Sequence, residues 1–125
     1  MRILKRRTMG RDRDRGAAIL EFAGFLPILL LVAMAGIQLG IIGYAASQAG
    51  TAARAAARTE SQEDLRGQGR ATGLAAMSDW LADGTVIDVG GTDTVTATAS
   101  VSIPSVVPGI KDFGKAVKEV TMPAD

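Results

Sequence analysis

The chain of 125 residues contains no cysteine and no histidine. Without cysteine it has no disulfide framework and no thiol chemistry, and without histidine it lacks the usual general base and the commonest metal ligand. Catalytic sites of the Ser-His-Asp and Cys-His types are therefore excluded. We expect no catalytic residues, no metal site, no cofactor and no enzymatic activity.

Two weaker patterns for small-molecule sites also fail. Asp83, Asp88 and Asp93 recur every five residues, but they lie at turn signals, where aspartate is common, and they lack the spacing of a calcium-binding loop. The sequence Gly-Gln-Gly at 67–69 follows no predicted strand and lacks the third glycine of a nucleotide-binding fingerprint. These residues give no reason to expect a bound ion or nucleotide.

The sequence also lacks any charge over the 32 residues 22–53. As a helix rising about 1.5 Å per residue, this stretch would be roughly 48 Å long, whereas the hydrocarbon core of a bilayer is about 30 Å thick. Alanine, the best helix former, dominates the later part and continues towards Arg58. We therefore predict a transmembrane helix that extends beyond the bilayer into solvent.

The balance of transfer free energies favours membrane insertion. Twelve Phe, Leu, Ile and Val residues lie between positions 22 and 42, and together they contribute roughly −4 to −7 kcal/mol. Glu21, Pro27 and Gln38 oppose insertion, but a carboxylate costs only about 3 kcal/mol even at the bilayer centre and less near the interface. The apolar contribution is larger, so we expect the helix to insert.

The first fifteen residues hold seven basic side chains against only Asp12 and Asp14. A basic flank just before an apolar span follows the positive-inside rule, so we expect a cytoplasmic N-terminus and an extracytoplasmic C-terminal part. Nucleic-acid binding is the competing use of such a cluster. It is disfavoured because no aromatic residue is interleaved with the basic ones and no recognition helix follows.

A secretory signal is a rival interpretation of the same segment. The basic start, the apolar residues 22–32 and Ala-Met-Ala at 33–35 fit a signal peptide that is cleaved after Ala35. The apolar run continues through Ile37, Leu39 and Ile42, however, so this cut would leave an apolar terminus. A secreted binding module is the alternative that this pattern leaves open.

Residues 16–22 read Gly-Ala-Ala-Ile-Leu-Glu-Phe, which resembles the cleavage site of type IV prepilins. The wider string of residues 15–27, with its Ala/Arg-rich continuation to Arg58, resembles the TadE-like family, the pilin-related proteins of tight-adherence (Tad, or Flp) pilus systems. The resemblance implies that a prepilin peptidase cuts between Gly16 and Ala17. It also implies that Glu21, the fifth residue of the mature chain, neutralises the amine of an adjacent subunit during assembly.

The chemistry of these residues agrees with that resemblance. Gly16 has no Cβ, so its backbone can approach a membrane protease closely, and we expect a flexible junction there. Glu21 lies one helical turn beyond Ala17, on the same helical face. A carboxylate in the first turn also interacts favourably with the helix dipole, by about 0.3 to 1 kcal/mol. The alternative is that Glu21 is only an interfacial acid.

Pro27 is expected to remove one backbone hydrogen bond and to kink the helix. Beyond it, Gly36, Gln38 and Gly40 lie on a face that also carries Ala33, Gly43 and Ala46 at helical spacing. Small residues of this kind allow two membrane helices to approach closely, and the Gln38 amide would hydrogen-bond across the contact. The alternative is a pair of lipid-facing glycines without a partner.

The remaining residues predict a small α+β domain. Leu74, Met77 and Leu81 form one apolar stripe at helical spacing, which predicts a short second helix within residues 61–82. Trp80 next to this stripe is interpreted as a core or interface anchor.

Turn signals then separate two predicted strands at residues 85–89 and 94–103. The second alternates strictly between apolar and polar residues, so one of its faces should be buried. Residues 115–122 fit either a helix or a strand, and comparison with the TadE-like family favours a third strand. A sheet this small is not stable alone, so its apolar face should pack on the protruding helix.

These observations predict a membrane α+β protein with a cytoplasmic leader at 1–16, a transmembrane and extended helix at 17–58, and an extracytoplasmic domain at 59–125. Its predicted role is that of a pilin-like subunit in Tad pilus assembly. The expected partners are the lipid bilayer, a prepilin peptidase, other pilin-like subunits and the Tad assembly platform. The alternative is an uncleaved single-pass envelope protein whose outer domain binds a partner.

Overall fold

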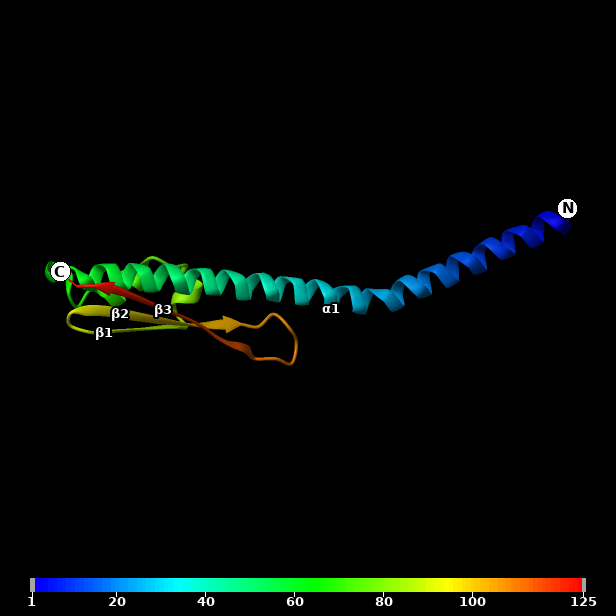
Figure 1. Cartoon of the computed structure of the whole chain (residues 1–125). Helices are drawn as coiled ribbons and strands as arrows, with labels where there is room; N and C mark the ends of the chain where they lie inside the picture. The colour runs from blue at the N-terminus through cyan, green and yellow to red at the C-terminus, as the bar shows by residue number, and fades with distance from the viewer. Residues whose placement is uncertain (1, 125) are drawn as a thin grey trace. The chain divides into compact units, whose positions relative to one another are not determined.

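A computed structural model describes the backbone of residues 2–124 and the side chains of residues 13–124. The elements follow the order α1 (Arg2–Ser61), η1 (Glu63–Leu65), α2 (Gly69–Ala75), α3 (Asp79–Ala82), β1 (Thr85–Gly90), β2 (Thr94–Pro104) and β3 (Asp112–Pro123) (Figure 1). This arrangement confirms the predicted α+β fold with one long apolar helix, short helices and a small antiparallel sheet.

The chain divides into two compact units, of which the first ends at Gly36 and the second runs Ile37–Asp125. The first unit is the N-terminal part of α1. The second contains the rest of α1 together with the short helices and the sheet. Its boundary lies inside α1 because the later turns of the helix pack with the C-terminal residues.

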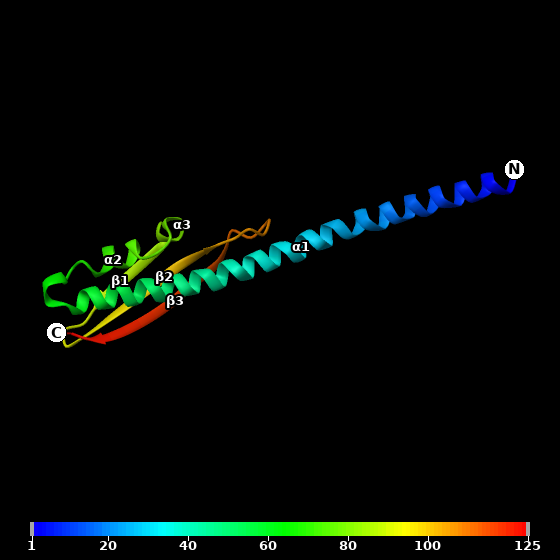
Figure 2. The same cartoon turned by 90° about the horizontal axis from the view of Figure 1, so that it is seen from above.

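Within the second unit, α1 and α2 lie over the same face of the sheet (Figure 2). The strand order is β1-β2-β3, and both neighbouring pairs are antiparallel. The prediction that residues 115–122 form a third strand is confirmed, since β3 includes all of them. The predicted alternation is also confirmed, because the inward residues of β2 are buried: Val95, Ala97, Ala99, Val101 and Ile103.

The face of α1 that meets the sheet and α2 is made of alanine. Six alanines in its last turns have no exposed surface: Ala45, Ala49, Ala52, Ala53, Ala56 and Ala57. The sequence predicts that the sheet packs on this protruding Ala-rich segment, and the structure confirms it by placing one side of the segment in the core with Leu81, Ile87 and Val101. Because a methyl group is the whole side chain, the sheet and α2 can approach the helix backbone closely.

Two glycines allow α2 to cross α1 at short range. A Cβ atom on Gly69 would lie 2.7 Å from the carbonyl oxygen of Ala56, and one on Gly73 would lie 2.9 Å from that of Ala52. The carboxylate of Glu60 fixes the start of α2, since its oxygens accept the backbone N–H groups of Gly67 (2.9 Å) and Gly69 (3.0 Å). This contact completes one side of the core.

The predicted second helix is broken into separate short elements. Gly67 adopts a φ of 91°, a conformation that glycine reaches without strain, and it separates η1 from α2. The apolar stripe is consequently divided, with Leu74 on α2, Met77 between the helices and Leu81 on α3. Met77 and Leu81 are buried, as the stripe predicts.

Candidate functional site

The first unit presents an apolar surface that nothing in the described chain covers. Each large apolar side chain from Ile19 to Val32 is at least 41% exposed. α1 contains one stretch that is long and apolar enough to cross a membrane. A soluble protein rarely exposes so continuous an apolar surface, and the helix fits a single-pass membrane protein.

Glu21 lies within this apolar surface. It lines a shallow hollow together with Ala18, Phe22, Phe25 and Leu29, whose spacing places them on one face of α1. The carboxylate therefore stands among aromatic and aliphatic side chains, at the membrane end that follows the basic residues. A carboxylate in such surroundings is costly in lipid.

The prediction of a flexible junction at Gly16 is wrong for the backbone, because α1 runs through this residue without a break. One glycine inside a helix costs only about 1 kcal/mol relative to alanine, and its neighbours Arg15, Ala17 and Ala18 favour helix. Among the side chains that the structure describes, those of residues 13–124, none beyond its chain neighbours comes within 4 Å of the position that a Cβ on Gly16 would occupy. The bond between Gly16 and Ala17 is thus sterically open on that side, although it is helical.

Pro27 lies inside α1, and the helix continues on both sides of it. A Cβ placed on Gly36 or Gly40 would meet no atom within 4 Å beyond the adjacent residues and the helix's own backbone, so no other part of the described chain packs there. This small-residue surface is free to meet another helix or lipid. The role of these three residues in helix packing stays a prediction.

Gln38 has a different partner from the one that the sequence predicts. Its side chain is only 2% exposed. Its Nε2 donates a 2.9 Å hydrogen bond to the carbonyl oxygen of Pro104, and its Oε1 accepts one of 2.9 Å from the N–H of Val106. The amide is therefore paired with the loop between β2 and β3 of the same chain. Sequence patterns missed this contact because its partners are 66 and 68 residues away.

The comparison with protein families bears directly on the segment that carries Gly16 and Glu21. Residues 16–58 match the TadE-like protein family. We call these residues the TadE-like segment, and the resemblance inferred from the sequence is confirmed. No curated protein and no solved structure matches the chain.

The TadE-like segment indicates involvement in a Tad pilus-related system, and its family is associated with pili rather than known for enzymatic activity. It begins at Gly16 and includes the apolar surface, Glu21 and the buried alanines. The residues after Arg58 lie outside the match. The structure nevertheless packs them against the last turns of the TadE-like segment, through Ala52 and Ala56.

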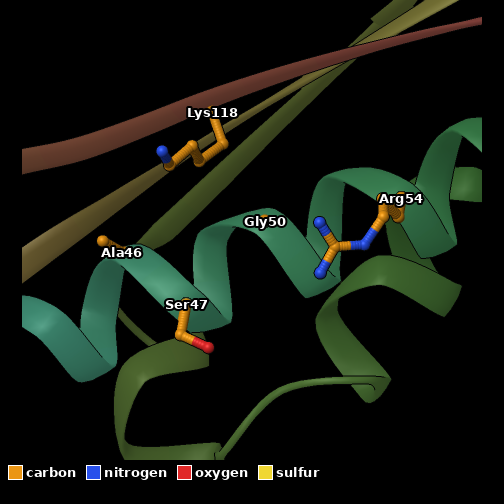
Figure 3. A pocket seen from close by; sticks show the side chains of 5 residues that line it. All are labelled: Ala46, Ser47, Gly50, Arg54 and Lys118. Atoms are coloured by element: carbon orange, nitrogen blue, oxygen red, sulfur yellow. The ribbon is translucent and has the colours of Figure 1, made fainter.

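Next to those turns lies a basic groove, lined by Ala46, Ser47, Gly50, Arg54 and Lys118 (Figure 3). Lys118 lies opposite Ala99 of β2 and therefore on the helix-facing side of the sheet. The sequence did not predict which face of β3 carries Lys118, because residues 115–122 fit both a helical and a strand pattern. An inward lysine on an edge strand discourages unwanted pairing with another strand, which is a structural role.

Proposed function

We propose that this chain is a pilin-like membrane subunit that takes part in the assembly of a Tad (Flp) pilus. The observation that carries the proposal is the TadE-like segment itself, which begins at Gly16 and places one acid, Glu21, on an otherwise apolar exposed helix. The partners of such a subunit are the lipid bilayer, a prepilin peptidase, other pilin-like subunits and the Tad assembly platform.

The proposed orientation has residues 1–16 in the cytoplasm as a leader and residues 59–125 outside. It rests on the basic side chains before Gly16, which the positive-inside rule retains on the cytoplasmic side. Residues 17–58 then cross the membrane and continue into the outer domain. The alanine core supports this arrangement, because the sheet packs on the later turns of the same helix that would cross the bilayer.

In the proposed maturation, a prepilin peptidase hydrolyses the peptide bond between Gly16 and Ala17. The helix has to open locally for this cut, and glycine lowers the cost of opening by about 1 kcal/mol relative to alanine. The product begins with a free amine on Ala17, four residues before Glu21. Maturation thus creates a cation at the membrane position where the acid stands.

Glu21 then has a partner of the right charge. In a bundle of mature subunits, the amine of one Ala17 pairs with the Glu21 carboxylate of a neighbour. Such pairing removes the cost of an isolated carboxylate beside Phe22 and Phe25. It also fixes the axial offset between adjacent helices, since only one register brings the two charges together.

N-terminal sequencing of the protein from membranes and from medium, in cells that are building pili, tests the proposal. A membrane-bound chain that begins at Ala17 supports it. An intact Met1 would instead indicate an uncleaved single-pass anchor, and a released chain that begins at Gly36 would indicate a secreted module. Either of these results would overturn the proposed maturation.

A further inference from the structure

The loop between β2 and β3, residues 105–111, carries apolar side chains that are open to the surroundings. Val106 is 41% exposed and Ile110 is 46% exposed, and Phe113 at the start of β3 is 38% exposed. We call these three residues the loop tip. The loop between β2 and β3 lies at the end of the sheet opposite the turn between β1 and β2 (Figure 1).

The loop is tied to α1 at a defined position. The Gln38 amide bonds to Pro104, the last residue of β2, and to Val106 in the loop. The helix residues on either side of Gln38, Ile37 and Leu39, are 57% and 70% exposed. The side chains next to Gln38 on α1 and those of the loop tip are therefore all apolar and exposed.

A pair of aromatic residues gives an independent indication of depth in the membrane. Tyr44 stacks on Trp80 of α3 with ring centroids 5.8 Å apart, and both side chains are exposed. The Tyr44 hydroxyl hydrogen-bonds to Ser78 Oγ. Exposed Tyr and Trp rings with a polar end are typical of the interface between bilayer and water. Gln38 precedes Tyr44 by six residues, or roughly 9 Å of helix at ~1.5 Å per residue, so it lies nearer the acyl chains.

We propose that the loop tip is embedded in the extracytoplasmic leaflet beside α1, with Val106, Ile110 and Phe113 among the lipid acyl chains. The neighbouring Lys111, which is exposed, then lies at the level of the lipid headgroups. The outer domain is held to the bilayer at two points, the transmembrane helix and the loop tip. Rotation of the domain about the helix axis is thereby restricted.

The inference rests on the proposed membrane insertion of α1, and brominated lipids test the two separately. Full-length protein carrying Trp80→Phe is reconstituted at low density into phosphatidylethanolamine and phosphatidylglycerol vesicles with brominated acyl chains. One tryptophan is then introduced by Val106→Trp in the loop tip, by Leu29→Trp in the apolar span, or by Thr92→Trp in the exposed turn between β1 and β2. Bromine quenches only tryptophans that contact acyl chains.

We expect Val106→Trp and Leu29→Trp to lose most of their emission and to shift to shorter wavelength, whereas Thr92→Trp keeps both intensity and wavelength. If Val106→Trp behaves like Thr92→Trp while Leu29→Trp is quenched, the inference is overturned and insertion of α1 stands. If Leu29→Trp is also unquenched, insertion itself fails. Circular dichroism of each variant verifies that its fold is retained.

The absence of cysteine allows a second measurement. Val106→Cys and Thr92→Cys in the same vesicles are treated with a membrane-impermeant maleimide before and after detergent is added. We expect Val106→Cys to react only after detergent and Thr92→Cys to react in both conditions. Protection of Val106→Cys without lipid quenching of Val106→Trp would show that a second copy of the chain covers the tip, and it would overturn the assignment to lipid.

Discussion

Gly73 and Ala52 lie so close together that a Cβ atom on the glycine would stand 2.9 Å from the Ala52 carbonyl oxygen. This distance is below ordinary van der Waals contact, so α2 can take its place on α1 only with glycine at position 73. A glycine that weakens the helix locally is retained because it permits the close crossing. At position 73, the space available for a side chain matters more than helix propensity.

Gly73→Ala should therefore destabilise the second unit. The added methyl would meet Ile87 Cδ1 at 2.6 Å, which can move aside, and the Ala52 carbonyl oxygen, which is backbone and cannot. Overpacking costs about 1 to 3 kcal/mol and exceeds the gain of up to about 1 kcal/mol in helix propensity. Urea unfolding of the full-length protein in detergent, followed by near-ultraviolet circular dichroism, measures the difference. Gly90→Ala, where no atom lies within 4 Å, is the matched control.

Ala52→Leu should lower the free energy of unfolding more than the same change at an exposed alanine. Ala52 has no exposed surface and faces α2, so three added carbon atoms must displace that helix or the sheet. We expect a loss of about 1 to 3 kcal/mol or more. Ala71→Leu on the exposed side of α2 is the control, and equal effects of the two variants would contradict a core made of alanine.

Gln38→Ala should release the loop between β2 and β3. The change leaves the Pro104 carbonyl and the Val106 N–H without their partner, at a cost of about 1 to 3 kcal/mol. Amide hydrogen exchange at Val106 in detergent should accelerate by about tenfold to a hundredfold, since each 1.4 kcal/mol corresponds to about a factor of ten. Gln68→Ala, at an exposed glutamine, should leave that rate unchanged.

Arg70 should stabilise the sheet through its hydrogen bond rather than its ion pair. Its Nε–H donates to the Ile87 carbonyl at 2.9 Å, which satisfies the outer edge of β1. Its Nη2 lies 3.9 Å from Asp88, and both side chains are well exposed, at 65% and 76%. Arg70→Ala should cost about 0.5 to 1.5 kcal/mol in urea unfolding and Asp88→Asn less than about 0.5. The opposite order would make the ion pair the larger contribution.

Glu21→Ala should abolish piliation while leaving insertion and processing intact. The substitution removes the proposed partner of the Ala17 amine but makes the helix more apolar, so insertion is not hindered. Electron microscopy of cell-surface pili, combined with N-terminal sequencing, separates assembly from cleavage. Glu63→Ala, at an exposed acid of η1, is the control. Normal pili in the Glu21 variant would exclude the residue from the mechanism.

The sequence predicted those features that depend on a pattern of neighbouring residues, such as an uncharged run or an alternation of apolar and polar side chains. The uncharged run predicted α1, and the alternation of Val95, Ala97 and Ala99 with polar residues predicted the buried face of β2. In residues 115–122 two periods overlapped, and the choice of a strand depended on comparison with the TadE-like family. The resemblance to this family was also recognisable, because Gly16 and Glu21 follow a basic segment and precede a long uncharged run.

The features that sequence missed depend on contacts between distant residues. The sequence predicted that the sheet packs on the helix, but it did not show which alanines are buried, because an alanine is compatible with both a solvated helix and a close-packed core; burial of Ala52 and Ala56 became apparent only with the sheet and α2 in place. Gly69 and Gly73 have low helix propensity, yet they allow two helices to cross at short range. The Gln38 amide looked suited to a second membrane helix, whereas it binds the chain's own loop.

The alanines of α1 that close the core all precede Thr59. A fragment that starts at Thr59 would keep every strand and yet lose one wall of its interior, so Ile87 and Val101 would face water. A cut that removes all of α1 would therefore also remove part of the core and unfold the remaining residues. Any protease that releases the sheet and short helices as a folded fragment must therefore cut upstream of Ala45.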